Sequence, residues 1–565
     1  MKKRILIVGG VAGGASVAAR ARRIDENAEV IMFERGPNVS FSNCCLPFYL
    51  SRTVAHSTDL VLMDPKQFKN QYNIDARVGY EVTAINRKKK TITVRNLKTG
   101  KSTEEAYDKL FLSPGAAPLK PKSITGVNGK NVFTIRNVVD IAALDDYIKK
   151  NKVQDVAVIG GGFIGVEAAE NLRHSGLNVT LIEALNQIMV PFDDDMAQIL
   201  HREMYDQGVN LMLGSGVKSI SAKEVTLENG KKVKAQAVVL AIGVRPETDL
   251  AVKAGLELGE TGAIKVDHNY MTSDPDIYAV GDAIEVYNQL THKPARLTMA
   301  GPAQRQARAA ADHMYGIPHN HKGVVGSSCI RIFDLNAACT GLNEKACKAA
   351  GINYDFVYVI PGDKVGLMPG SNPMHFKMLF EYPTGKILGA QAIGKGTADK
   401  RIDVIATLIQ MGGTLEDLKE LELCYSPAYS TAKDVVNHAA LVALNLLYGR
   451  FKQVPVSSVR DLVKKKAFIV DVREPGEFAL GHLKGAKNIP LSEFRGRMKE
   501  IPKNKPVYLH CRSSQRSYNA LLALQAAGYD QVYNISGSYL GICNYEYFHD
   551  QTSKRERIMT EYNFN

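Results

Sequence analysis

The sequence has no tryptophan, few cysteines and no long apolar run, and these absences exclude several classes of protein. Eight cysteines among 565 residues are too few for a small disulfide-stabilised scaffold. None stands in CxxC spacing and no histidines stand in HxxxH spacing, so no metal site is predicted. No apolar run approaches the ~18 residues that a membrane-spanning helix needs. The composition, 45% hydrophobic and 23% charged, is that of a globular chain rather than a disordered, collagen-like or coiled-coil one.

The N-terminus, MKKRILIVGGVAGG, resembles a signal peptide for six residues and then becomes rich in glycine without a small-residue cleavage site. We therefore expect mature protein from the start, located in the cytoplasm with reduced cysteines. At roughly 100–200 residues per domain, the length predicts three to five domains.

The net charge of +13 raises the question of nucleic-acid binding. Residues 451–565 contain 18 Lys and Arg against 11 Asp and Glu, so over half of the excess lies in the last fifth of the chain. The basic residues do not alternate with aromatic ones, and runs such as 88–90 and 464–466 are typical of a solvated surface. Small anionic substrates are therefore favoured over nucleic acid or membrane as partners.

A dinucleotide-binding motif opens the chain. The apolar run 3–9 suits a buried parallel strand, a helix-like stretch reaches Arg23, and a second strand, EVIMFER, brings Glu34 to its end. Glycines in the turn let backbone N–H groups approach a pyrophosphate, and the acid accepts hydrogen bonds from ribose hydroxyls. These glycines are Gly9, Gly10, Gly13 and Gly14, with Val11 in the place of the middle glycine of GxGxxG.

The motif repeats about 150 residues later, in a second unit that starts with residues 156–162 (VAVIGGG). Gly160, Gly162 and Gly165 have the full GxGxxG spacing, and the strand NVTLIEA carries Glu183. Two such motifs predict two bound dinucleotides with hydride transfer between them. Glu183 should repel a 2′-phosphate, and no arginine follows it nearby, so NADH is favoured over NADPH.

Two further stretches are interpreted as flavin contacts. Ser113 and Gly115 follow an apolar strand, and Gly281 and Asp282 end the run TSDPDIYAVGDA. An acid at such a strand end can hold the ribityl chain of FAD, although an isolated Asp is more often a helix cap.

The rest of the chain carries no further dinucleotide motif. Residues 325–445 hold strands and a helix-rich end. The run 451–458 is interpreted as a linker, and three strands separated by helical stretches follow it (AFIVDVRE, PVYLHCRS and QVYNISG). These features predict a separate α/β domain of about 110 residues.

Several motifs carry a resemblance to known families. Residues 40–47, SFSNCCLP, resemble the SFxxCxxP of coenzyme A disulfide reductases. Residues 1–445 resemble the FAD-dependent pyridine nucleotide–disulfide oxidoreductases, in the branch with one active cysteine that also includes NADH peroxidase and NADH oxidase. The runs DVR, GHLKGA and NIP, together with the loop CRSSQR, resemble a rhodanese domain in residues 451–565. The fusion resembles coenzyme A disulfide reductase–rhodanese proteins and NADH-dependent persulfide reductases.

The resemblance implies an α/β fold with two Rossmann-like dinucleotide-binding domains, an α+β dimerisation domain, a C-terminal α/β rhodanese domain and a homodimer. The implied boundaries are 1–150 and 271–325 for the two parts of the FAD-binding domain, 151–270 for the NAD(H)-binding domain, 326–448 for the dimerisation domain and 449–565 for the rhodanese domain.

Cys44 is the predicted redox nucleophile. Tyr49 stands where a CxxxxC pair would have its second cysteine, so Cys44 must form a mixed disulfide, a persulfide or a sulfenic acid. A buried structural cysteine is the alternative. Cys45 is expected to be non-catalytic, because a disulfide between adjacent residues needs a strained peptide. The remaining cysteines outside the rhodanese-like loop are interpreted as structural: Cys329, Cys339, Cys347, Cys424 and Cys543.

A basic face on the first helix is the predicted substrate site. Ser16, Arg20 and Arg23 share one helical face, and arginines suit phosphates through bidentate contacts. In coenzyme A disulfide reductases the matching positions, with those of Ser40 and Asn43, bind coenzyme A, which we expect as the bound thiol. An exposed basic face is the alternative. Gln71-Tyr72 stands where the family often has a basic residue, so one phosphate contact is missing or is supplied elsewhere.

Tyr425 matches a family tyrosine that reaches the active cysteine across the dimer. A phenol there can hydrogen-bond a leaving thiolate or protonate it, and a packed core tyrosine is the alternative. The family's second tyrosine is absent, because the corresponding run reads Leu367-Met368.

The second predicted nucleophile is Cys511. The loop CRSSQR runs from a strand into a helix, where backbone N–H groups and the helix N-terminus favour an anion and hence a thiolate. Arg516 closes the loop and Arg512 adds charge within it. The loop is one residue shorter than the CxxxxxR of phosphatases, which favours sulfane-sulfur transfer.

These features together predict an NADH-dependent flavoenzyme that reduces persulfides, polysulfides or coenzyme A disulfide forms at Cys44, with Cys511 handling sulfane sulfur. An NADH oxidase or peroxidase with a Cys44 sulfenic acid is one alternative, and a non-catalytic flavin-based redox sensor is another.

Overall fold

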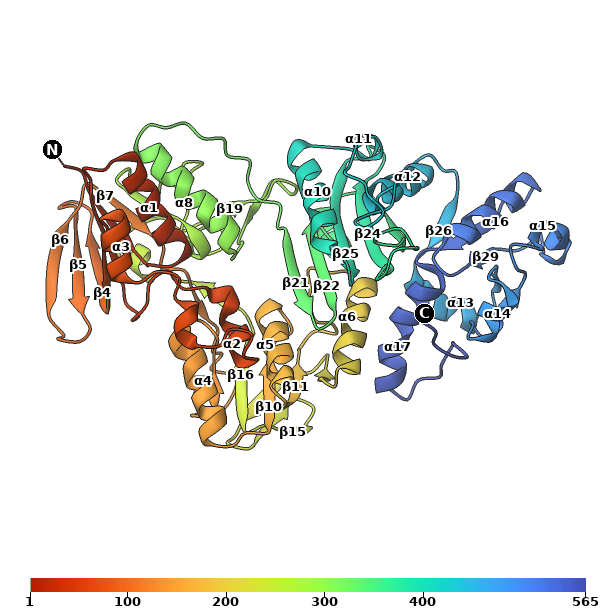
Figure 1. Cartoon of the computed structure of the whole chain (residues 1–565), viewed down its shortest axis with the longest axis horizontal. Coiled ribbons are helices and arrows are strands. Elements are labelled where there is room, and N and C mark those ends of the chain that lie inside the picture. The colour runs from red at the N-terminus through yellow and green to blue at the C-terminus, as the bar shows by residue number, and fades with distance from the viewer. Residues whose placement is uncertain (1, 565) are drawn as a thin grey trace. The chain divides into compact units, whose positions relative to one another are not determined.

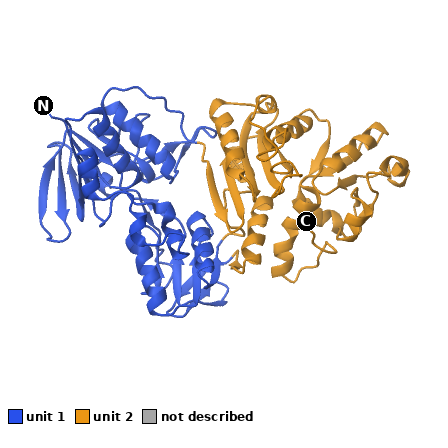
Figure 2. Cartoon of the chain, in the orientation of Figure 1, with its two compact units in different colours: residues 1–184, 215–324 blue, residues 185–214, 325–565 orange. Residues whose placement is uncertain are grey.

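A computed structural model describes residues 2–564, and its internal contacts divide the chain into two units (Figure 2). The first unit comprises residues 1–184 and 215–324, and the second comprises residues 185–214 and 325–565. Both mix helices with sheets, so the predicted α/β class is confirmed. Within the described residues, no helix is both long and apolar enough to cross a membrane.

The first glycine motif lies in a five-stranded parallel sheet of the first unit (Figure 1). Its strands, in spatial order, are β18 (Ile277–Ala279), β7 (Lys109–Leu112), β1 (Arg4–Val8), β2 (Glu29–Glu34) and β3 (Asp75–Val78). Strand β1 is central, and Ile5, Leu6 and Ile7 are fully buried, as a continuous apolar run predicts. Helices α1 (Ala12–Ile24) and α8 (Ala300–Met314) pack together on one face of this sheet.

A second parallel sheet carries the second glycine motif. Strands β11 (Asn178–Ile182), β10 (Asp155–Ile159), β16 (Ala237–Leu240) and β9 (Val132–Phe133) lie side by side in that order. Helix α5 (Phe163–His174) follows β10 directly, as the motif predicts. The short helix α2 (Leu46–Leu50) packs against α5 and α4 (Val138–Lys150), which places the segment carrying Cys44 beside the second glycine motif (Figure 1).

The second unit contains an antiparallel sheet formed by residues 328–394. In spatial order its strands are β21 (Ser328–Ile332), β22 (Leu335–Gly341), β25 (Ile387–Gly394), β24 (Met374–Glu381) and β23 (Tyr354–Val359). Helices α10 (Ala398–Met411) and α12 (Val435–Leu447) pack against it. Every residue of β25 is buried, so this sheet is covered on both faces.

Lys377 joins helix α6 (Asp194–Asp206) to this sheet. Its amine is fully buried and lies 2.9 Å from Asp195, 3.2 Å from Asp193 and 2.6 Å from Glu344. Burial alone would lower the pKa of Lys377, but the three carboxylates outweigh burial and raise it. In the described part of the chain these carboxylates form the one cluster with metal-ligand spacing, and the ammonium group already neutralises part of its charge.

The C-terminal region of the second unit is a parallel sheet with the order β26-β30-β29-β27-β28. Strands β27 (Phe468–Asp471), β29 (Val507–His510) and β30 (Val532–Ile535) lie in the three predicted strand segments, and β28 is Lys487–Asn488. Helices α16 (Gln515–Ala526) and α17 (Ser538–Thr552) follow β29 and β30.

The linker prediction for residues 451–458 is wrong. Residues 452–454 form strand β26 (Lys452–Val454), which pairs with β30. Phe451 and Val456 on either side are buried, at 3% and 2% exposure. Partners that come about 80 residues later in the sequence stabilise this short strand, and a local pattern with four polar residues and one proline does not reveal them.

Candidate active sites

The first glycine turn approaches the end of β7 so closely that side chains are excluded. A Cβ at Gly9 would lie 2.0 Å from the Ser113 carbonyl oxygen, and one at Gly13 would lie 2.4 Å from Ser113 Oγ. Gly9 also has a φ of +95°, which favours glycine. A Cβ at Gly14 would lie 1.8 Å from the Gly9 carbonyl oxygen. The structure therefore brings Ser113 against the predicted pyrophosphate turn.

Both motif acids face their own glycine turns. The Glu34 carboxylate accepts hydrogen bonds from the N–H groups of Gly10 (2.9 Å) and Gly36 (2.8 Å). The Glu183 carboxylate accepts one from the N–H of Gly161 (2.6 Å). Each carboxylate is thus fixed at the end of its strand, beside the turn where a ribose would lie.

Gly281 and Asp282 complete the predicted flavin contacts in the 3₁₀ turn η3 (Gly281–Ala283). The Gly281 N–H donates to Gln306 Oε1 (2.8 Å), and a Cβ on Gly281 would lie 3.5 Å from Ser113 Oγ. Burial raises the pKa of Asp282, and no donor within residues 2–564 hydrogen-bonds its carboxylate. Gln306 lies in α8, far from any glycine motif, and sequence reasoning missed it.

These observations fit a bound dinucleotide. Gly115, with a φ of +76°, and Gly162 at the start of α5 have open space where a side chain would be. Around the second turn, Cβ atoms on Gly160 and Gly165 would meet backbone oxygens at 2.3 and 1.9 Å. Close backbone packing at both turns, with open space at Gly162 in the second turn and at Gly115 beside the first, forms a cradle for phosphate groups.

Cys44 lies in the 3₁₀ turn η1 (Asn43–Cys45), immediately before α2. It is exposed and Cys45 is half-buried, and both are free thiols. Desolvation raises the pKa of the Cys44 thiol, and the charges of Glu167, Cys45 and Asp282 raise it further. Glu167 is on α5, the helix that packs against α2, and burial raises its own pKa to about 7. An ionised Glu167 therefore disfavours the Cys44 thiolate.

Replacing Glu167 with glutamine should make Cys44 more reactive. Removal of a nearby negative charge lowers the pKa of Cys44, so at pH 8 its alkylation by iodoacetamide should be about two- to threefold faster. Mass spectrometry of the peptide that carries Cys44 would measure the rate, and both proteins would also carry Cys45→Ser so that the neighbouring thiol is not alkylated. Because Glu167 is largely protonated below pH 7, the difference between the variants should shrink there, and an equal rate at pH 8 would contradict the electrostatic argument.

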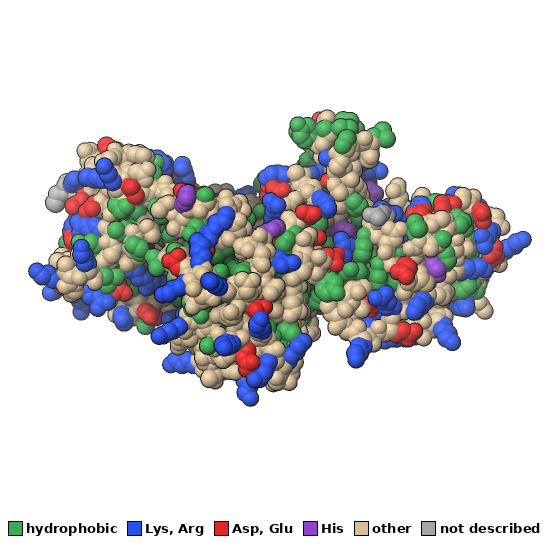
Figure 3. Space-filling model, turned by 60° about the horizontal axis from the view of Figure 1, so that its bottom comes forward, with side chains coloured by type: hydrophobic (Ala, Val, Ile, Leu, Met, Phe, Trp, Pro, Cys, Tyr) green, Lys and Arg blue, Asp and Glu red, His purple; other side chains and the backbone are tan. Residues whose placement is uncertain are grey.

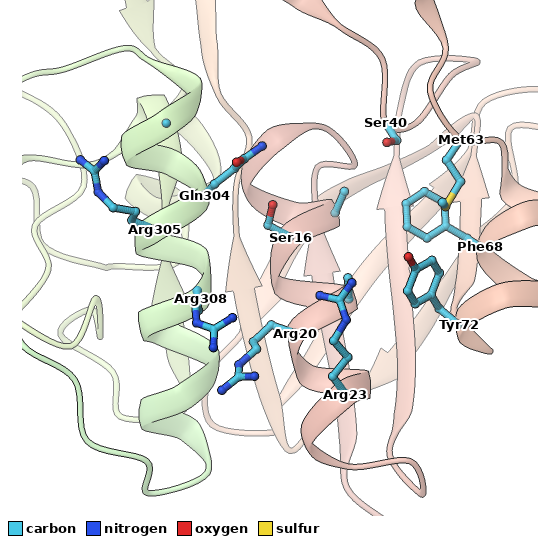
Figure 4. Close-up of a pocket in the computed structure, with 13 residues that line it drawn as sticks. Ser16, Arg20, Arg23, Ser40, Met63, Phe68, Tyr72, Gln304, Arg305 and Arg308 are labelled. Atoms are coloured by element: carbon cyan, nitrogen blue, oxygen red, sulfur yellow. The ribbon is translucent and has the colours of Figure 1, made fainter. Parts of the chain in front are cut away.

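A pocket of about 660 Å³ extends along α1, with α8 on one side and Met63, Phe68 and Tyr72 on the other (Figure 4). Ser16, Arg20, Arg23 and Ser40, all predicted substrate residues, line it. Asn43 does not, and its side-chain amide donates instead to the Arg136 carbonyl oxygen at 3.4 Å. The structure therefore brings four of the five predicted residues together, one of them from the segment that carries Cys44.

Sequence reasoning missed the α8 side of this pocket. Gln304, Arg305 and Arg308 of α8 also line the pocket. In Figure 4 the side chains of Gln304 and Arg308 extend toward α1, whereas that of Arg305 extends away from it. The Arg20 Nε donates to Asp312, which also lies 3.8 Å from Arg308. Arg305 and Arg308 are one helical turn apart, so the sequence could have indicated a basic helical face. Only the fold reveals that α8 packs on α1.

Tyr72 occupies the position where the resemblance leads one to expect a basic residue. It lines the same pocket, and the Arg23 guanidinium lies 5.6 Å from its ring centroid. An arginine stacked on an aromatic ring keeps its hydrogen-bonding edge available for an anion.

Tyr425 lies in a segment between α11 (Leu415–Lys419) and α12, and it is 51% exposed. Leu367, where the family has its second tyrosine, is 93% exposed. Tyr429 and Met411 are also exposed, at 79% and 71%. Figure 3 shows hydrophobic side chains gathered on one projecting part of the visible face, whereas Lys and Arg are spread among acidic and apolar groups.

Cys511 follows β29 directly and precedes α16, as predicted for its loop. Its side chain is buried, at 1% exposure. Ser514, at the start of α16, has a φ of +76°, which turns the chain sharply into the helix. The first N–H groups of a helix have no intrahelical acceptors, so a helix start that directly follows the loop favours an anion there.

Arg516 is fixed beside Cys511 by a bidentate ion pair with Glu477, at 2.6 and 2.7 Å. The Glu477 carboxylate and the Cys511 sulfur both raise the pKa of Arg516. Arg512 lies elsewhere in the loop, and its charge contributes to the lowered pKa of His375 in β24. The two arginines of the loop therefore have different surroundings.

Three polar residues around Cys511 were not predicted. Ser517 Oγ lies 3.6 Å from Cys511 Sγ and 2.7 Å from Asn534 Oδ1. The Cys511 N–H donates to Ser538 Oγ at 3.1 Å. These residues come from α16, β30 and the start of α17, and only the sheet order brings them to the loop.

The other cysteines have mixed environments. Cys339, Cys347 and Cys543 are buried, which agrees with a structural interpretation, whereas Cys329 and Cys424 are exposed.

Two glycine motifs with their acids, a single exposed cysteine beside the second motif, and a cysteine-arginine loop at a helix start define a two-dinucleotide thiol oxidoreductase joined to a sulfurtransferase-like domain. Residues 3–307 match the family described as pyridine nucleotide-disulphide oxidoreductase, residues 328–435 match its dimerisation domain, and residues 456–545 match the rhodanese-like domain. The chain belongs to the pyridine nucleotide-disulphide oxidoreductase family, whose members use FAD and NAD(P)H.

Individual relatives agree with this assignment. The coenzyme A disulfide reductase of Staphylococcus epidermidis is 34% identical over 435 residues, which cover 77% of this chain and 98% of that one. The reduced CoADR-RHD of Bacillus anthracis has a TM-score of 0.93 and 43% identity, covering 97% of this chain and 98% of that one. An NAD-dependent persulfide reductase from A. fulgidus has a TM-score of 0.91 and 33% identity, with 95% and 99% coverage. The predicted class, a disulfide or persulfide oxidoreductase with a rhodanese domain, is thereby confirmed.

Proposed function

We propose that this enzyme uses NADH to reduce persulfides, polysulfides or disulfides of coenzyme A at Cys44. The observation that supports this proposal most strongly is the pocket along α1, which α8 also lines. Arg20, Arg23, Arg305 and Arg308 line it together with Ser40, which lies four residues before Cys44. Arginines on two helices suit a thiol that carries several phosphate groups, which is the chemistry of coenzyme A.

The reaction at Cys44 begins with the thiolate attacking the substrate's sulfur–sulfur bond. With a persulfide RSSH, attack on the inner sulfur forms Cys44–S–S–R and releases HS⁻. Two electrons from NADH then cleave the mixed disulfide, which restores the Cys44 thiolate and releases RS⁻. The sum is RSSH + NADH + H⁺ → RSH + H₂S + NAD⁺.

FAD, when bound, supplies the relay that passes two electrons from the nicotinamide to the cysteine. We assign its binding to residues 1–150 and 271–325, where the first glycine turn, Glu34, Ser113 and the unpartnered Asp282 carboxylate would hold its phosphates and hydroxyl groups. We assign the nicotinamide cofactor to residues 151–270. In this part, the second glycine turn would hold the pyrophosphate and Glu183 would hold a ribose.

Cofactor preference should follow from Glu183. An ionised carboxylate accepts hydrogen bonds from a 2′-hydroxyl and repels a 2′-phosphate, so kcat/KM for NADH should exceed that for NADPH by at least about tenfold, on the order of 1.4 kcal/mol. Steady-state kinetics with both cofactors would measure the ratio. Glu183→Gln removes the charge and keeps an acceptor for the Gly161 N–H, so it should narrow the ratio. Equal efficiencies in the unmodified enzyme would show that Glu183 does not select.

Cys511 would accept sulfane sulfur as a persulfide. Attack of its thiolate on thiosulfate forms Cys511–S–S⁻ and releases sulfite, and Arg516 together with the α16 N-terminus would stabilise the anions involved. Arg512 would contribute a further positive charge within the loop.

A homodimer is part of the proposal. The match to a dimerisation domain and the exposure of Leu367, Met411 and Tyr429 support it. Tyr425 would then contribute its phenol to the partner's reaction, by hydrogen-bonding the leaving thiolate.

Assays of NADH consumption with different electron acceptors distinguish the proposed reductase from an oxidase, a peroxidase and a redox sensor. NADH consumption would be followed without oxygen, with a persulfide, a polysulfide and coenzyme A disulfide each as acceptor, and separately with oxygen and peroxide. Turnover with oxygen or peroxide alone would establish a sulfenic-acid oxidase or peroxidase, and no turnover with any acceptor would favour a redox sensor. Mass spectrometry that finds coenzyme A in mixed disulfide with Cys44 would identify the thiol.

A further inference from the structure

Tyr358 of β23 lies in the antiparallel sheet but faces the C-terminal domain within the same unit. It is 3% exposed, and its hydroxyl lies 2.6 Å from His375 Nδ1. Burial lowers the pKa of His375 to about 3, with added effects from Arg202 and Arg512, and burial raises the pKa of Tyr358 well above its ordinary value. Both groups are therefore neutral near pH 7, and their hydrogen bond fixes the phenol ring over the physiological pH range.

The ring lies against two glycines at the start of α17. A Cβ on Gly537 would lie 2.6 Å from Tyr358 Cε1, and one on Gly541 would lie 3.3 Å from the same atom. Gly537 also has a φ of +77°, so the chain turns sharply into α17 at the point where the ring touches it. The absence of side chains at both positions is what allows the contact.

The turn at residues 537–540 is hydrogen-bonded to the backbone of the Cys511 loop. The Cys511 N–H donates to Ser538 Oγ (3.1 Å), while the N–H groups of Tyr539 and Leu540 donate to the carbonyl oxygens of Cys511 (3.0 Å) and Arg512 (3.1 Å). Ser514 Oγ also lies 3.2 Å from Ser538 Oγ. A displacement of residues 537–540 would therefore move the loop backbone.

Other contacts attach the C-terminal domain independently of Tyr358. Helices α6 and α17 lie side by side (Figure 1), where Arg202 donates to Asn544 (2.8 Å) and the Tyr547 hydroxyl donates to Asp206 (3.1 Å). Gln453 Nε2 donates to the Phe356 carbonyl oxygen (2.7 Å). Loss of the Tyr358 ring would thus leave the two domains packed together and change chiefly the support behind residues 537–540.

We propose that Tyr358 is a positioning residue for Cys511, so that the sheet of residues 328–394 forms the rear wall of the sulfurtransferase site. The proposal rests on the proposed role of Cys511 in sulfane-sulfur transfer. The phenol touches neither the sulfur nor a substrate. It acts through Gly537 and the Ser538–Leu540 turn, which set the backbone of residues 511–514 and hence the direction of the N–H groups around the thiolate.

The test uses the full-length holoenzyme with Tyr358→Ala and Tyr358→Phe. Alanine removes the ring, and kcat for thiosulfate:cyanide sulfurtransfer should fall about tenfold, because small displacements of reacting groups are costly. Phenylalanine keeps the ring and should retain at least about half of the activity. NADH-dependent reduction of a small free persulfide should stay within about twofold in both variants, because that chemistry uses Cys44.

The pH dependence of Cys511 alkylation separates positioning from general destabilisation. In Tyr358→Ala the midpoint of the rate against pH should move upward, since misdirected N–H groups favour the thiolate less. In Tyr358→Phe it should not move. A merely structural role would lower the melting temperature and leave the midpoint unchanged. Unchanged kcat and an unchanged midpoint in Tyr358→Ala would overturn the proposal.

Gly541→Ala tests the contact from the other side, including the case in which Tyr358→Ala does not fold. The new methyl would lie 3.3 Å from Tyr358 Cε1 and 3.1 Å from Val456 Cγ1, so it should also lower kcat. Unchanged kcat in Gly541→Ala would count against the proposal. If the unmodified enzyme has no sulfurtransferase activity, the proposed function of Cys511 fails, and the alkylation midpoint still decides the role of Tyr358.

Discussion

Replacing Cys44 with serine should lower NADH-dependent reduction of persulfides and coenzyme A disulfide by about a thousandfold or more, because a serine hydroxyl cannot form the mixed disulfide. Anaerobic NADH consumption at saturating acceptor would measure the loss. The variant should still bind FAD, since Gly9, Gly13, Glu34 and Asp282 lie in other elements and do not depend on the thiol. The flavin absorbance spectrum of the purified variant would verify this.

Cys45→Ser is the matched control for this experiment. It changes the neighbouring thiol in the same 3₁₀ turn, and it should keep most of the activity because Cys45 is half-buried and Cys44 is exposed. Full activity in Cys44→Ser together with loss in Cys45→Ser would transfer the nucleophile to Cys45. Loss in both variants would indicate that the two thiols act together.

Strands, turns and helices within each glycine motif could be predicted because their signals are local. The run 3–9 became β1, the helix predicted to reach Arg23 ends at Ile24, and the second strand of the motif became β2 with Glu34 at its end. The close approach of Gly9 to Ser113 agrees with the motif, because a glycine turn in a parallel sheet lies against the end of the neighbouring strand.

The parts that were missed depend on contacts between distant segments. Arg305 and Arg308 belong to the pocket only because α8 packs on α1, about 280 residues earlier in the chain. Residues 452–454 form strand β26 because they pair with the edge of strand β30. In each case tertiary packing decides the outcome, and local propensity carries little information about it.

The second large effect is expected at Cys511. Replacing it with serine should remove thiosulfate:cyanide sulfurtransferase activity, a loss of about a thousandfold or more, because only a thiolate in this loop can hold sulfane sulfur. The buried sulfur, the sharp turn at Ser514 and Arg516, which Glu477 holds by a bidentate ion pair, all belong to one anion-favouring site, which serine would leave in place. Release of thiocyanate from thiosulfate and cyanide measures this activity directly.

The same variant shows whether the two cysteines work independently. Reduction of a small free persulfide should remain largely intact in Cys511→Ser, because Cys44 and the two glycine motifs form a site of their own. Reduction should slow only when the sulfur donor, such as thiosulfate, must first deliver its sulfur to Cys511. Loss of NADH-dependent reduction with every substrate would contradict this independence, since Cys511 would then have to receive the sulfur before Cys44 in all cases. Normal thiosulfate-dependent reduction would instead show that thiosulfate reaches Cys44 without the rhodanese domain.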